Sequence, residues 1–335
     1  MKLLVTGGCG FIGSNFIRYI LDKRENWKII NIDKLTYAGN RINLSDIREN
    51  DRYSFIQGDI TNIDLLKGLF QRNEFDAVVN FAAETHVDKS LENPTPFVET
   101  NIRGTQALLE VSRANWRTES EKFNFVHIST DEVYGSLGQE GNFSESSPLL
   151  PNNPYSASKA SADMICKSYN KSFSFPVTIL RGSNIYGPYQ YPEKLIPAMI
   201  NKALNDEPLT IYGKGNEVRD WLYVADYVSA VEKVLENNPS GEVYNVGGGQ
   251  ERKNIEVVRR IKKTLKENSS IEHVDPEILF IKDPRGEAHD FRYALDYTKI
   301  NRELSWQPKI DFETGLADTV NWYVENRDWI DKVID

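Results

Sequence analysis

Cysteine and histidine are scarce in this chain of 335 residues, and basic residues are outnumbered by acidic ones. The two cysteines, Cys9 and Cys166, have no spacing that suggests a disulfide framework or a zinc site, so we expect reduced thiols. The four histidines show no ligand pattern either, and we expect no metal. With 40 Lys and Arg against 49 Asp and Glu, the net charge is −9. This balance argues against a nucleic-acid partner, because phosphate backbones need a clustered basic face.

Long hydrophobic runs are absent as well. No apolar run reaches the roughly 18 residues that a membrane span requires, so we expect no membrane partner. The first residues lead directly into an apolar segment, which leaves no room for a signal peptide and predicts a cytoplasmic protein. Hydrophobic residues nevertheless make up 40% of the chain, enough for a substantial core. The length fits one large domain and a smaller one.

Short apolar segments alternate with helix-period segments along the first half of the chain. The expected strands are Leu3–Thr6, Ile29–Ile32, Tyr53–Gln57, Ala77–Phe81, Phe125–Ile128 and Val177–Leu180. The expected helices are Phe11–Lys23, Asp64–Gln71, Phe97–Asn115 and Tyr155–Ser172. Short strands that are apolar on both faces and alternate with helices predict an α/β fold with a Rossmann-type, doubly wound parallel sheet.

The regular alternation of strands and helices ends at about Ser183. Helices at Leu195–Leu204 and Ile255–Glu267 mix with short extended pieces, whereas Val224–Glu236 and Val243–Val246 look like a further helix and strand of the first domain. We therefore expect a discontinuous second domain. The predicted division is a dinucleotide-binding domain, 1–182 plus about 222–249, and a smaller α/β substrate-binding domain, about 183–221 plus 250–335.

A glycine-rich turn stands where the first strand meets the first helix. The run Gly7–Gly13 satisfies G-x-G-x-x-G through Gly8, Gly10 and Gly13. Glycines allow a tight turn, and the helix N-terminus can then direct its N–H groups at a pyrophosphate. Such turns also serve simple strand-to-helix packing, but the position directly after the first strand favours a dinucleotide cofactor.

Acidic residues follow the next two strands. Asp33 ends the second strand, and a carboxylate there can accept hydrogen bonds from ribose hydroxyls and repel a 2′-phosphate. This favours NAD over NADP, although Lys34 beside it weakens the preference. Asp59 follows the third strand and can bind the adenine edge, and Phe81–Thr85, after the fourth, can line the nicotinamide ribose.

Tyr155 and Lys159 lie four residues apart and hence on one helical face. An ammonium near a phenol favours the phenolate, so we expect a lowered tyrosine pKa that suits a general base. The pair also fits a buried tyrosine beside a surface lysine. Its place after the fifth strand of a dinucleotide fold favours a role in removing a hydroxyl proton.

Thr130, Asp131 and Glu132 come directly after the fifth strand, at the edge where open α/β sheets bind ligands. Adjacent carboxylates are typical of a solvated turn. In this position they can instead divide the work of an elimination, one donating a proton and the other removing one, if their environments separate their pKa values.

Several motifs resemble the dTDP-glucose 4,6-dehydratase family of the extended short-chain dehydrogenase/reductase superfamily. The resemblance covers essentially the whole chain, and the Thr–Asp–Glu triplet separates it from most sugar epimerases of that superfamily. The motifs that carry it are Thr6–Gly13, Asp33–Asn40, Ala82–Asp88, Thr130–Gly135 and Tyr186–Pro197.

The resemblance implies a reaction on dTDP-glucose that yields dTDP-4-keto-6-deoxy-glucose and water, with NAD regenerated in each cycle. Tyr155 would deprotonate the C4 hydroxyl during hydride transfer, and Thr130 would hydrogen-bond that oxygen. Glu132 would remove the C5 proton, and Asp131 would protonate the departing C6 hydroxyl. The product would feed deoxysugar biosynthesis, for example that of rhamnose.

The resemblance also implies the contact residues. With the strand-end positions, the expected cofactor contacts are Gly7, Gly10, Phe11, Ile12, Gly13, Asp33, Lys34, Leu35, Thr36, Asp59, Ile60, Phe81, Ala82, Ala83, Thr85, Thr100, Tyr155, Lys159 and Ile185. The expected substrate contacts are Thr85, Thr130, Asn184, Lys194, Leu195, Thr210, Ile211, Tyr212, Arg219, Asn254, Arg285 and His289. The positive charges of Lys194 and Arg219 can neutralise the diphosphate, and an arginine can bind it through two parallel hydrogen bonds.

One run departs from the family pattern. The family carries Asp-Arg-Pro-Gly-His-Asp near the sugar-nucleotide pocket, whereas this chain has Asp-Pro-Arg-Gly-Glu-Ala-His-Asp at 283–290. Proline and arginine are exchanged, and two residues separate glycine from histidine. The nucleotide preference therefore stays open between dTDP and UDP.

Three alternatives remain beside the dehydratase. They are the same reaction on UDP-glucose, a 4-epimerase or decarboxylase that shares the Tyr/Lys pair without needing Asp131, and a non-catalytic dinucleotide sensor. A sensor needs no phenolate, which argues against the last. The family resemblance also suggests a homodimer in which the helices Phe97–Asn115 and Tyr155–Ser172 pair across the interface.

Overall fold

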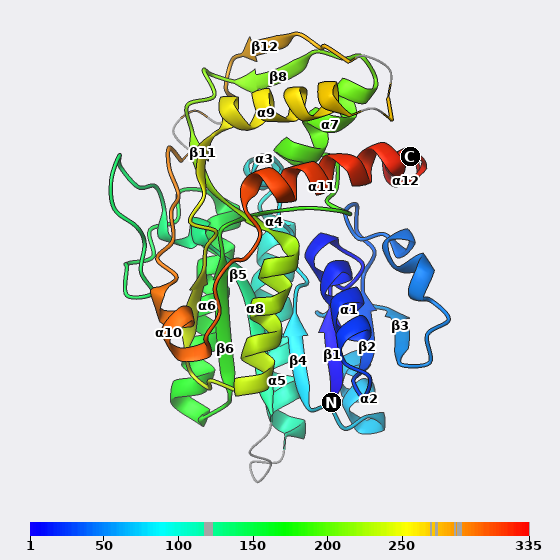
Figure 1. Cartoon of the computed structure of the whole chain (residues 1–335). Helices are drawn as coiled ribbons and strands as arrows, with labels where there is room; N and C mark the ends of the chain where they lie inside the picture. Colours follow the sequence, from blue (N-terminus) through cyan, green and yellow to red (C-terminus); the bar gives the residue numbers. More distant parts are fainter. Residues whose placement is uncertain (117–122, 269, 272–273, 285, 287–289, 335) are drawn as a thin grey trace.

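A seven-stranded parallel sheet forms the centre of the computed structural model, which describes residues 1–116, 123–268, 270–271, 274–284, 286 and 290–334. The strands follow the order β10-β6-β5-β4-β1-β2-β3 (Figure 1). Their bounds are β1 Lys2–Thr6, β2 Lys28–Asp33, β3 Tyr53–Gln57, β4 Ala77–Asn80, β5 Asn124–Thr130, β6 Val177–Gly182 and β10 Val243–Val246. Because the chain starts in the middle and winds outward both ways, the predicted doubly wound fold is confirmed.

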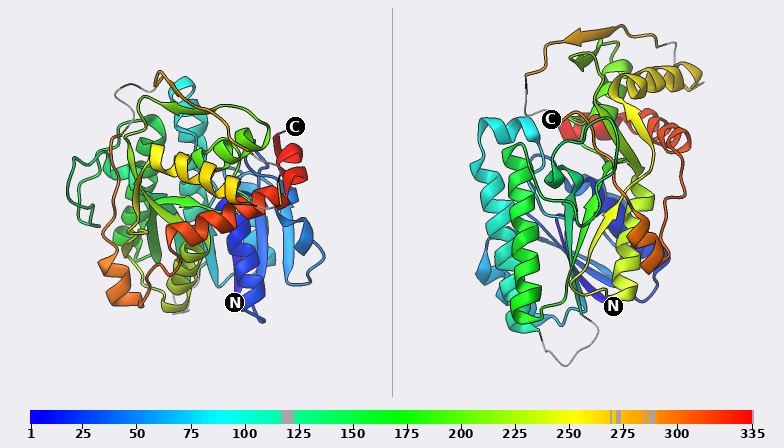
Figure 2. Two further views of the ribbon diagram at one scale, coloured as in Figure 1. Left: turned by 45° about the horizontal axis from the view of Figure 1, so that its top comes forward. Right: turned by 90° about the vertical axis from the view of Figure 1, so that its left-hand side faces the viewer.

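Helices cover both faces of this sheet (Figure 2). On one face α1 (Phe11–Lys23) packs against α8 (Val224–Asn237). On the other lie α2 (Ile63–Arg72), α5 (Thr105–Asn115) and α6 (Pro154–Phe173). The strands are buried on both sides for this reason, which explains why they read as continuous apolar runs.

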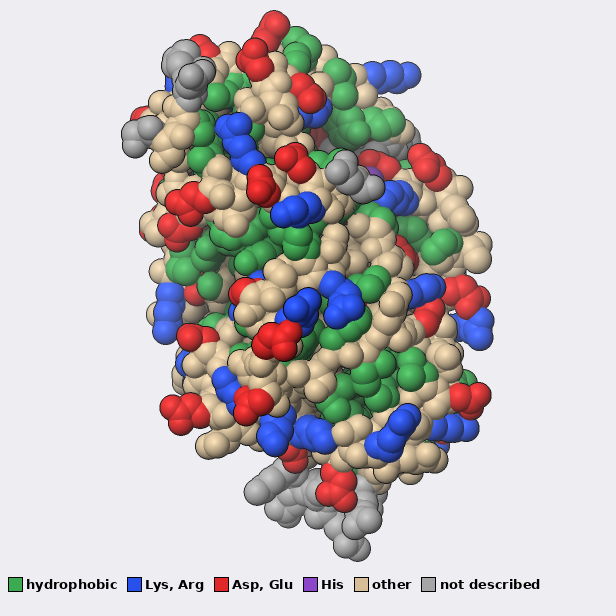
Figure 3. All heavy atoms as spheres, turned by 90° about the vertical axis from the view of Figure 1, so that its right-hand side faces the viewer, with side chains coloured by type: hydrophobic (Ala, Val, Ile, Leu, Met, Phe, Trp, Pro, Cys, Tyr) green, Lys and Arg blue, Asp and Glu red, His purple; other side chains and the backbone are tan. Residues whose placement is uncertain are grey.

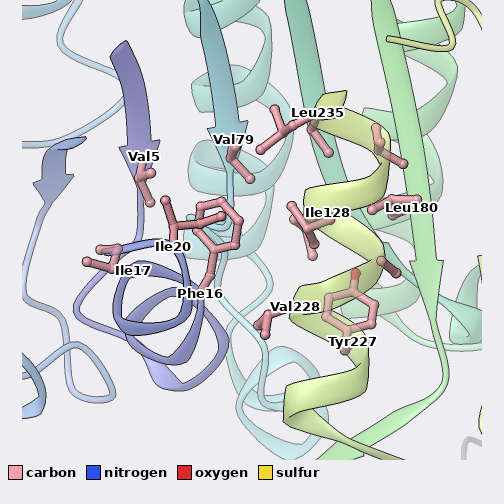
Figure 4. Packing of buried hydrophobic residues seen from close by; sticks show 14 of the residues in the cluster. Val5, Phe16, Ile17, Ile20, Val79, Ile128, Leu180, Tyr227, Val228 and Leu235 are labelled. Atoms are coloured by element: carbon pink, nitrogen blue, oxygen red, sulfur yellow. The ribbon is translucent and has the colours of Figure 1, made fainter. Parts of the chain in front are cut away.

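The core between α1, α8 and the sheet is shown in Figure 4. Phe16 and Ile20 stand one turn apart on α1 and are fully buried. They face Val79 of the sheet, and Val228 of α8 belongs to the same cluster. The helical spacing of apolar residues recognised in the sequence is thus the spacing that fills this layer.

The expected helix Phe97–Asn115 is not regular. It consists of α4 (Thr95–Phe97), the π-helical segment η2 (Val98–Gly104) and α5. Within η2, Asn101 donates to Ser158 Oγ at 2.8 Å and to the Glu84 carbonyl at 3.0 Å. The wider turn places these contacts toward α6 and the end of β4, and π-bulges are common at functional sites.

The second half of the chain builds a smaller layer above the carboxyl ends of the strands (Figure 1). It contains a three-stranded sheet, β11-β9-β7, and a two-stranded one, β12-β8. The bounds are β7 Asn184–Tyr186, β8 Leu209–Tyr212, β9 Val218–Tyr223, β11 Glu251–Lys253, β12 Ile278–Ile281, α7 Leu195–Leu204, α9 Asn254–Glu267, α11 Phe312–Glu325 and α12 Arg327–Ile334. Residues such as Ile200, Val258 and Leu316 form its own buried cluster.

The connection between the layers crosses more than once. Helix α10 (Thr298–Leu304) belongs to the later part of the sequence, yet Ile300, Leu304 and Trp306 pack in the core of the seven-stranded sheet. The predicted division assigned residues 250–335 to the smaller domain, whereas residues 298–306 pack on the larger layer. The domain boundaries therefore stay a prediction.

The surface mixes charges of both signs. On the face drawn in Figure 3, lysine and arginine side chains stand among aspartates and glutamates. Across the described part of the chain, none of the helices combines the length and the apolar character that crossing a membrane demands.

Candidate active site

Two cavities open at the carboxyl ends of the strands, between the two layers. The first has a volume of about 300 Å³, and its lining includes the ends of β1, β2, β4 and β5. The second, of about 390 Å³, is lined by α7, β8 and β9 together with residues near 290. Both linings include Glu132, Asn184, Glu193 and Lys194. The cavities therefore share a wall, and ligands bound in them would meet there.

The glycine turn is shaped for close approach. Gly7 has a φ of +68°, and a Cβ on it would lie 2.6 Å from the Ala82 nitrogen. A Cβ on Gly13 would lie 2.4 Å from the Gly7 carbonyl oxygen. Helix α1 begins after Gly10, which offers no side-chain cap, and its first-turn residues line the first cavity. The turn thus fits a dinucleotide pyrophosphate at the helix N-terminus.

Asp33 ties the glycine turn to β2. Its carboxylate accepts from the Cys9 nitrogen at 2.9 Å and from the Leu35 nitrogen at 2.8 Å, while burial raises its pKa. Lys34 lies with its Nζ 2.8 Å from Asp59 Oδ2. The lysine that weakened the preference for NAD is therefore engaged with a carboxylate of the same cavity.

The Thr–Asp–Glu triplet spans the end of β5 and the short 3₁₀ helix η3 (Asp131–Tyr134). Thr130 Oγ1 caps η3 by accepting from the Glu132 nitrogen at 3.3 Å and donates to Asp131 Oδ1 at 3.2 Å. Ser156 Oγ, next to Tyr155, donates to Glu132 Oε2 at 3.1 Å. The structure thus brings the triplet and the Tyr155/Lys159 pair to one cavity.

The two carboxyls have different surroundings. Burial, then Glu132 and Asp220, raise the pKa of Asp131 well above its ordinary value, and its Oδ2 has no hydrogen-bond partner among the described residues. The pKa of Glu132 is also raised by burial, but Lys194 and Arg219 act against that shift. Asp131 is thereby favoured as the proton donor and Glu132 as the acceptor.

The expected lowering of the Tyr155 pKa is wrong for this structure. Burial, followed by the charge of Glu132, raises it well above the ordinary value, and only the hydrogen bond to Thr130 works the other way among the main causes. Lys159 donates instead to the Ile128 carbonyl at 2.6 Å, and burial lowers its pKa to about 8. A cation beside the phenol would act in the opposite direction.

The predicted contact residues divide between the cavities. Every predicted cofactor residue lines the first cavity except Leu35, whose side chain packs against the core. Of the predicted substrate residues, the first cavity has Thr85 and Thr130, and both cavities have Asn184 and Lys194. The second cavity has Leu195, Thr210, Ile211, Tyr212, Arg219 and Asn254. Arg285 and His289 lie outside the described residues.

Arg219 is more buried than a surface cation would be, with 8% exposure. Its guanidinium donates to the carbonyls of Asp290 at 2.8 Å and Phe291 at 3.3 Å, and it lies 4.5 Å from the ring centre of Tyr293. Besides lining the second cavity, it therefore fixes the chain segment that follows residue 289.

Sequence reasoning missed Glu193 on the shared wall. Its carboxylate accepts from Tyr37 Oη at 2.9 Å and lies 3.6 Å from His86 Nε2 and 3.6 Å from Lys89 Nζ. Glu193 stands beside Lys194 in the motif Tyr186–Pro197, and this position was the one sequence feature that could have indicated a role in the site. The other missed lining residues include Gln190, Tyr191, Met199, Lys202, Trp221, Ile281 and Tyr293.

Comparisons with known proteins agree with these motifs. The family model for GDP-mannose 4,6 dehydratase matches residues 4–319. A dTDP-glucose 4,6-dehydratase of Xanthomonas campestris pv. campestris is 47% identical over 99% of this chain and 95% of its own length.

Two solved structures are similar over nearly their whole length. One is a dTDP-glucose 4,6-dehydratase of Bacillus anthracis in complex with NAD, with a TM-score of 0.89, 46% identity and 99% coverage of both chains. The other is a dTDP-glucose 4,6-dehydratase of Streptomyces venezuelae with NAD and TYD bound, with a TM-score of 0.91 and 42% identity. It covers 99% of this chain and 100% of its own. The predicted resemblance is confirmed, and the chain belongs to the GDP-mannose 4,6 dehydratase family, within which it groups with the dTDP-glucose 4,6-dehydratases.

Proposed function

We propose that this chain is an NAD-dependent dTDP-glucose 4,6-dehydratase that forms dTDP-4-keto-6-deoxy-glucose and water. The observation that carries the proposal is the placement of Asp131 and Glu132 in the same cavity as Tyr155 and Lys159. A tyrosine and a lysine suffice for oxidation at C4. The two carboxyls add what an elimination needs, an acid and a base at neighbouring carbons.

The first cavity has the features of a dinucleotide site. The glycine turn and the start of α1 would hold the pyrophosphate, and Asp33 would bind the adenosine ribose. When bound there, NAD accepts a hydride from C4 of the sugar and later returns it to C6. Its positive nicotinamide ring would also favour the Tyr155 phenolate, opposing the effect of burial.

The chain's own residues then act on protons. Tyr155 takes the proton of the C4 hydroxyl, and Thr130 hydrogen-bonds that oxygen. The resulting ketone makes the C5 proton acidic, and Glu132 removes it. Ser156 Oγ orients the Glu132 carboxylate by donating a hydrogen bond to Oε2 at 3.1 Å. Asp131, which retains its proton through burial, gives it to the C6 hydroxyl as water leaves. When hydride returns to C6, Glu132 gives a proton back to C5, which restores the C5–H bond.

The diphosphate would lie in the second cavity. Lys194 and Arg219 contribute positive charge to its lining, and Asn254 stands at the first residue of α9. Thr210, Ile211 and Tyr212 of β8 offer an edge for the base. Nothing in this set favours a thymine over a uracil, so UDP-glucose stays the second candidate substrate.

The first experiment incubates the wild-type protein with dTDP-glucose in heavy water, without added NAD. We expect a 4-keto-6-deoxy product that carries deuterium at C5, identified by mass spectrometry and NMR. UDP-glucose in a parallel reaction decides the nucleotide preference. Recovery of unchanged sugar, or of a galactose isomer, would contradict the dehydratase and favour a sensor or an epimerase respectively.

A cytoplasmic homodimer is part of the proposal. Exposed apolar side chains gather on neighbouring helices: Leu91 on α3 (Val87–Glu92), Val98 on η2, and Met164 and Phe173 on α6. These helices include the pair expected to meet across an interface. Sedimentation of the wild type should give a mass of about twice the chain's 38.3 kDa, and Met164→Glu should shift it toward the monomer.

A further inference from the structure

A cluster of charged side chains lies buried behind the tyrosine–lysine pair, between α6 and the sheet. Asp163 stands one turn beyond Lys159 on α6, and Arg181 projects from β6. Both are fully buried, as is His127 of β5, and Lys159 itself is 4% exposed. Asp163, Arg181 and His127 are absent from the lining of either cavity, so the proposed reaction steps leave them unused.

Arg181 links the two elements that carry the proposed catalytic groups. Its Nε donates to Asp163 Oδ2 at 2.8 Å, which fixes it to α6. Its Nη1 donates to Tyr134 Oη at 2.7 Å, and Tyr134 is the last residue of η3, the helix of Asp131 and Glu132. Tyr134 in turn donates to Asn245 Oδ1 of β10 at 2.7 Å. The Arg181 guanidinium thus fixes the position of α6 relative to η3.

The charges of this cluster do not cancel. Lys159 and Arg181 are cations, and Asp163 is the carboxylate that favours the charged form of both, since it raises the pKa of each. His127 stays neutral because burial, then Lys159 and Arg181, lower its pKa well below the ordinary value. Its Nε2 lies 3.7 Å from Asp163 Oδ1, an oxygen for which the described part of the chain offers no hydrogen-bond partner.

Strands β5 and β6 and helices η3 and α6 pack around Lys159 and its neighbours. Strand β5 presents the Ile128 carbonyl and His127, and β6 presents Arg181. Helix η3 brings Asp131 and Glu132 toward Tyr155. Helix α6 itself contributes Asp163 and Cys166, whose thiol stays neutral through burial. Tyr155 precedes Lys159 by one turn, and Lys167 lies near Arg181 and Asp163. Among these groups Asp163 is the carboxylate on the far side of Lys159 from the cavity.

We infer that Asp163, fixed by Arg181, is the positioning residue that keeps the Lys159 ammonium charged. The inference rests on the proposed function, because the charge of Lys159 matters to turnover only if Tyr155 acts as the base. An ammonium removed from water loses its proton readily unless a carboxylate compensates it. Lys159 is 4% exposed and lines the first cavity, where NAD would bind, so a compensating carboxylate has to lie on the protein side of the ammonium.

The test compares Asp163→Asn with Glu232→Gln. Glu232 is an equally buried carboxylate of α8 that pairs with Lys23 at 2.7 Å and Arg24 at 2.6 Å, remote from the cavities. Both changes remove a paired buried charge and should reduce thermal stability. Only Asp163→Asn should move the alkaline limb of the kcat/KM profile to lower pH, giving about a tenfold loss at pH 8.5 and little loss at pH 6.

A readout independent of turnover separates this inference from the proposed function. In protein labelled with ¹³C at lysine Cε, the Lys159 signal, assigned by its loss in Lys159→Arg, should titrate at lower pH in Asp163→Asn. If wild type does not convert dTDP-glucose, the proposed function fails and this titration alone decides the inference. If wild type is active and neither titration nor pH profile moves, the inference is overturned.

A second variant covers the case in which Asp163→Asn does not fold. Arg181→Gln removes a cation and leaves the carboxylate to Lys159, so the alkaline limb should move to higher pH. A purely structural ion pair predicts loss of stability for both variants with an unchanged profile. Opposite displacements of the limb in the two variants would support the inference, and an unchanged profile in both would overturn it.

Discussion

The two cavities of this chain are assembled in different ways. The first is lined mainly by residues that end strands of the central sheet or directly follow them, such as Asp33, Thr130 and Gly7. The second gathers side chains from α7, β8, β9 and α9 and from the segment near residue 290. A local sequence signal is enough to recognise the first, because strand ends meet at one edge of a parallel sheet. The second exists only once distant segments have packed.

This comparison predicts that changes at the first cavity affect chemistry and cofactor retention, whereas changes at the second affect mainly substrate affinity.

The largest effect is expected at Tyr155. Tyr155→Phe removes the proposed base, and product formation should fall about 10³-fold because general-base catalysis contributes about that much. The rate of 4-keto product formation measures it. Tyr169→Phe, on the same helix and bonded to Glu110 at 3.0 Å, is the control and should stay near wild type.

Asp131→Asn should be next in size. Water loss should fall about 10²-fold, while C5 exchange in heavy water persists, since Glu132 and Tyr155 are intact. Mass spectrometry of the recovered sugar separates the two steps. Equal slowing of both would show that Asp131 is not the specific acid, and Glu140→Gln in the loop that follows should change neither step.

The same variant should be more stable than wild type at neutral pH. Burial raises the Asp131 pKa, so the folded protein holds a proton that the unfolded chain releases, and this costs stability as pH rises above the ordinary carboxyl range. Asparagine has no such cost. The advantage in melting temperature should therefore be larger at pH 8 than at pH 5. A constant difference would contradict the raised pKa.

Asp33→Asn should weaken NAD retention about tenfold, because the proposed hydrogen bond from the adenosine ribose would lose its charged acceptor. The nucleotide released on denaturation, and calorimetry on stripped protein, measure it. Asp46→Asn, an exposed partner of Arg18, is the control and should leave retention unchanged. If Asp33→Asn retains NAD as well as wild type does, Asp33 does not bind the adenosine ribose.

The smallest effect is expected in the second cavity. Lys202 Nζ donates to Thr210 Oγ1 at 2.6 Å, and Thr210→Val should raise the KM for dTDP-glucose about threefold with kcat unchanged. Thr314→Val, far along the chain on α11, should alter neither constant. A large fall in kcat for Thr210→Val would break the comparison, since it would make this cavity part of the chemistry.

The sequence alone was sufficient for the sheet and for the residues at its edge. Strand β3 and helices α1 and α7 have the bounds expected from periodicity, because their apolar faces pack directly on a core. The π-helical turn of η2 was not predicted, since it depends on Asn101 reaching Ser158 and Glu84 from distant parts of the chain. The direction of the Tyr155 pKa was wrong because burial and the charge of Glu132, which sequence spacing cannot show, raise it, while Lys159 donates to the Ile128 carbonyl.

The common wall of Glu132, Asn184, Glu193 and Lys194 has an evolutionary consequence. With NAD and the sugar nucleotide bound as proposed, a change in any of these four side chains would alter the fit of both ligands at once, so new sugar-nucleotide preferences would have to arise elsewhere. The outer rim, where Thr210, Tyr212 and Ile281 line only the second cavity, is free to diverge. Descendants of this scaffold should therefore exchange one nucleotide for another at the rim long before they alter the reaction.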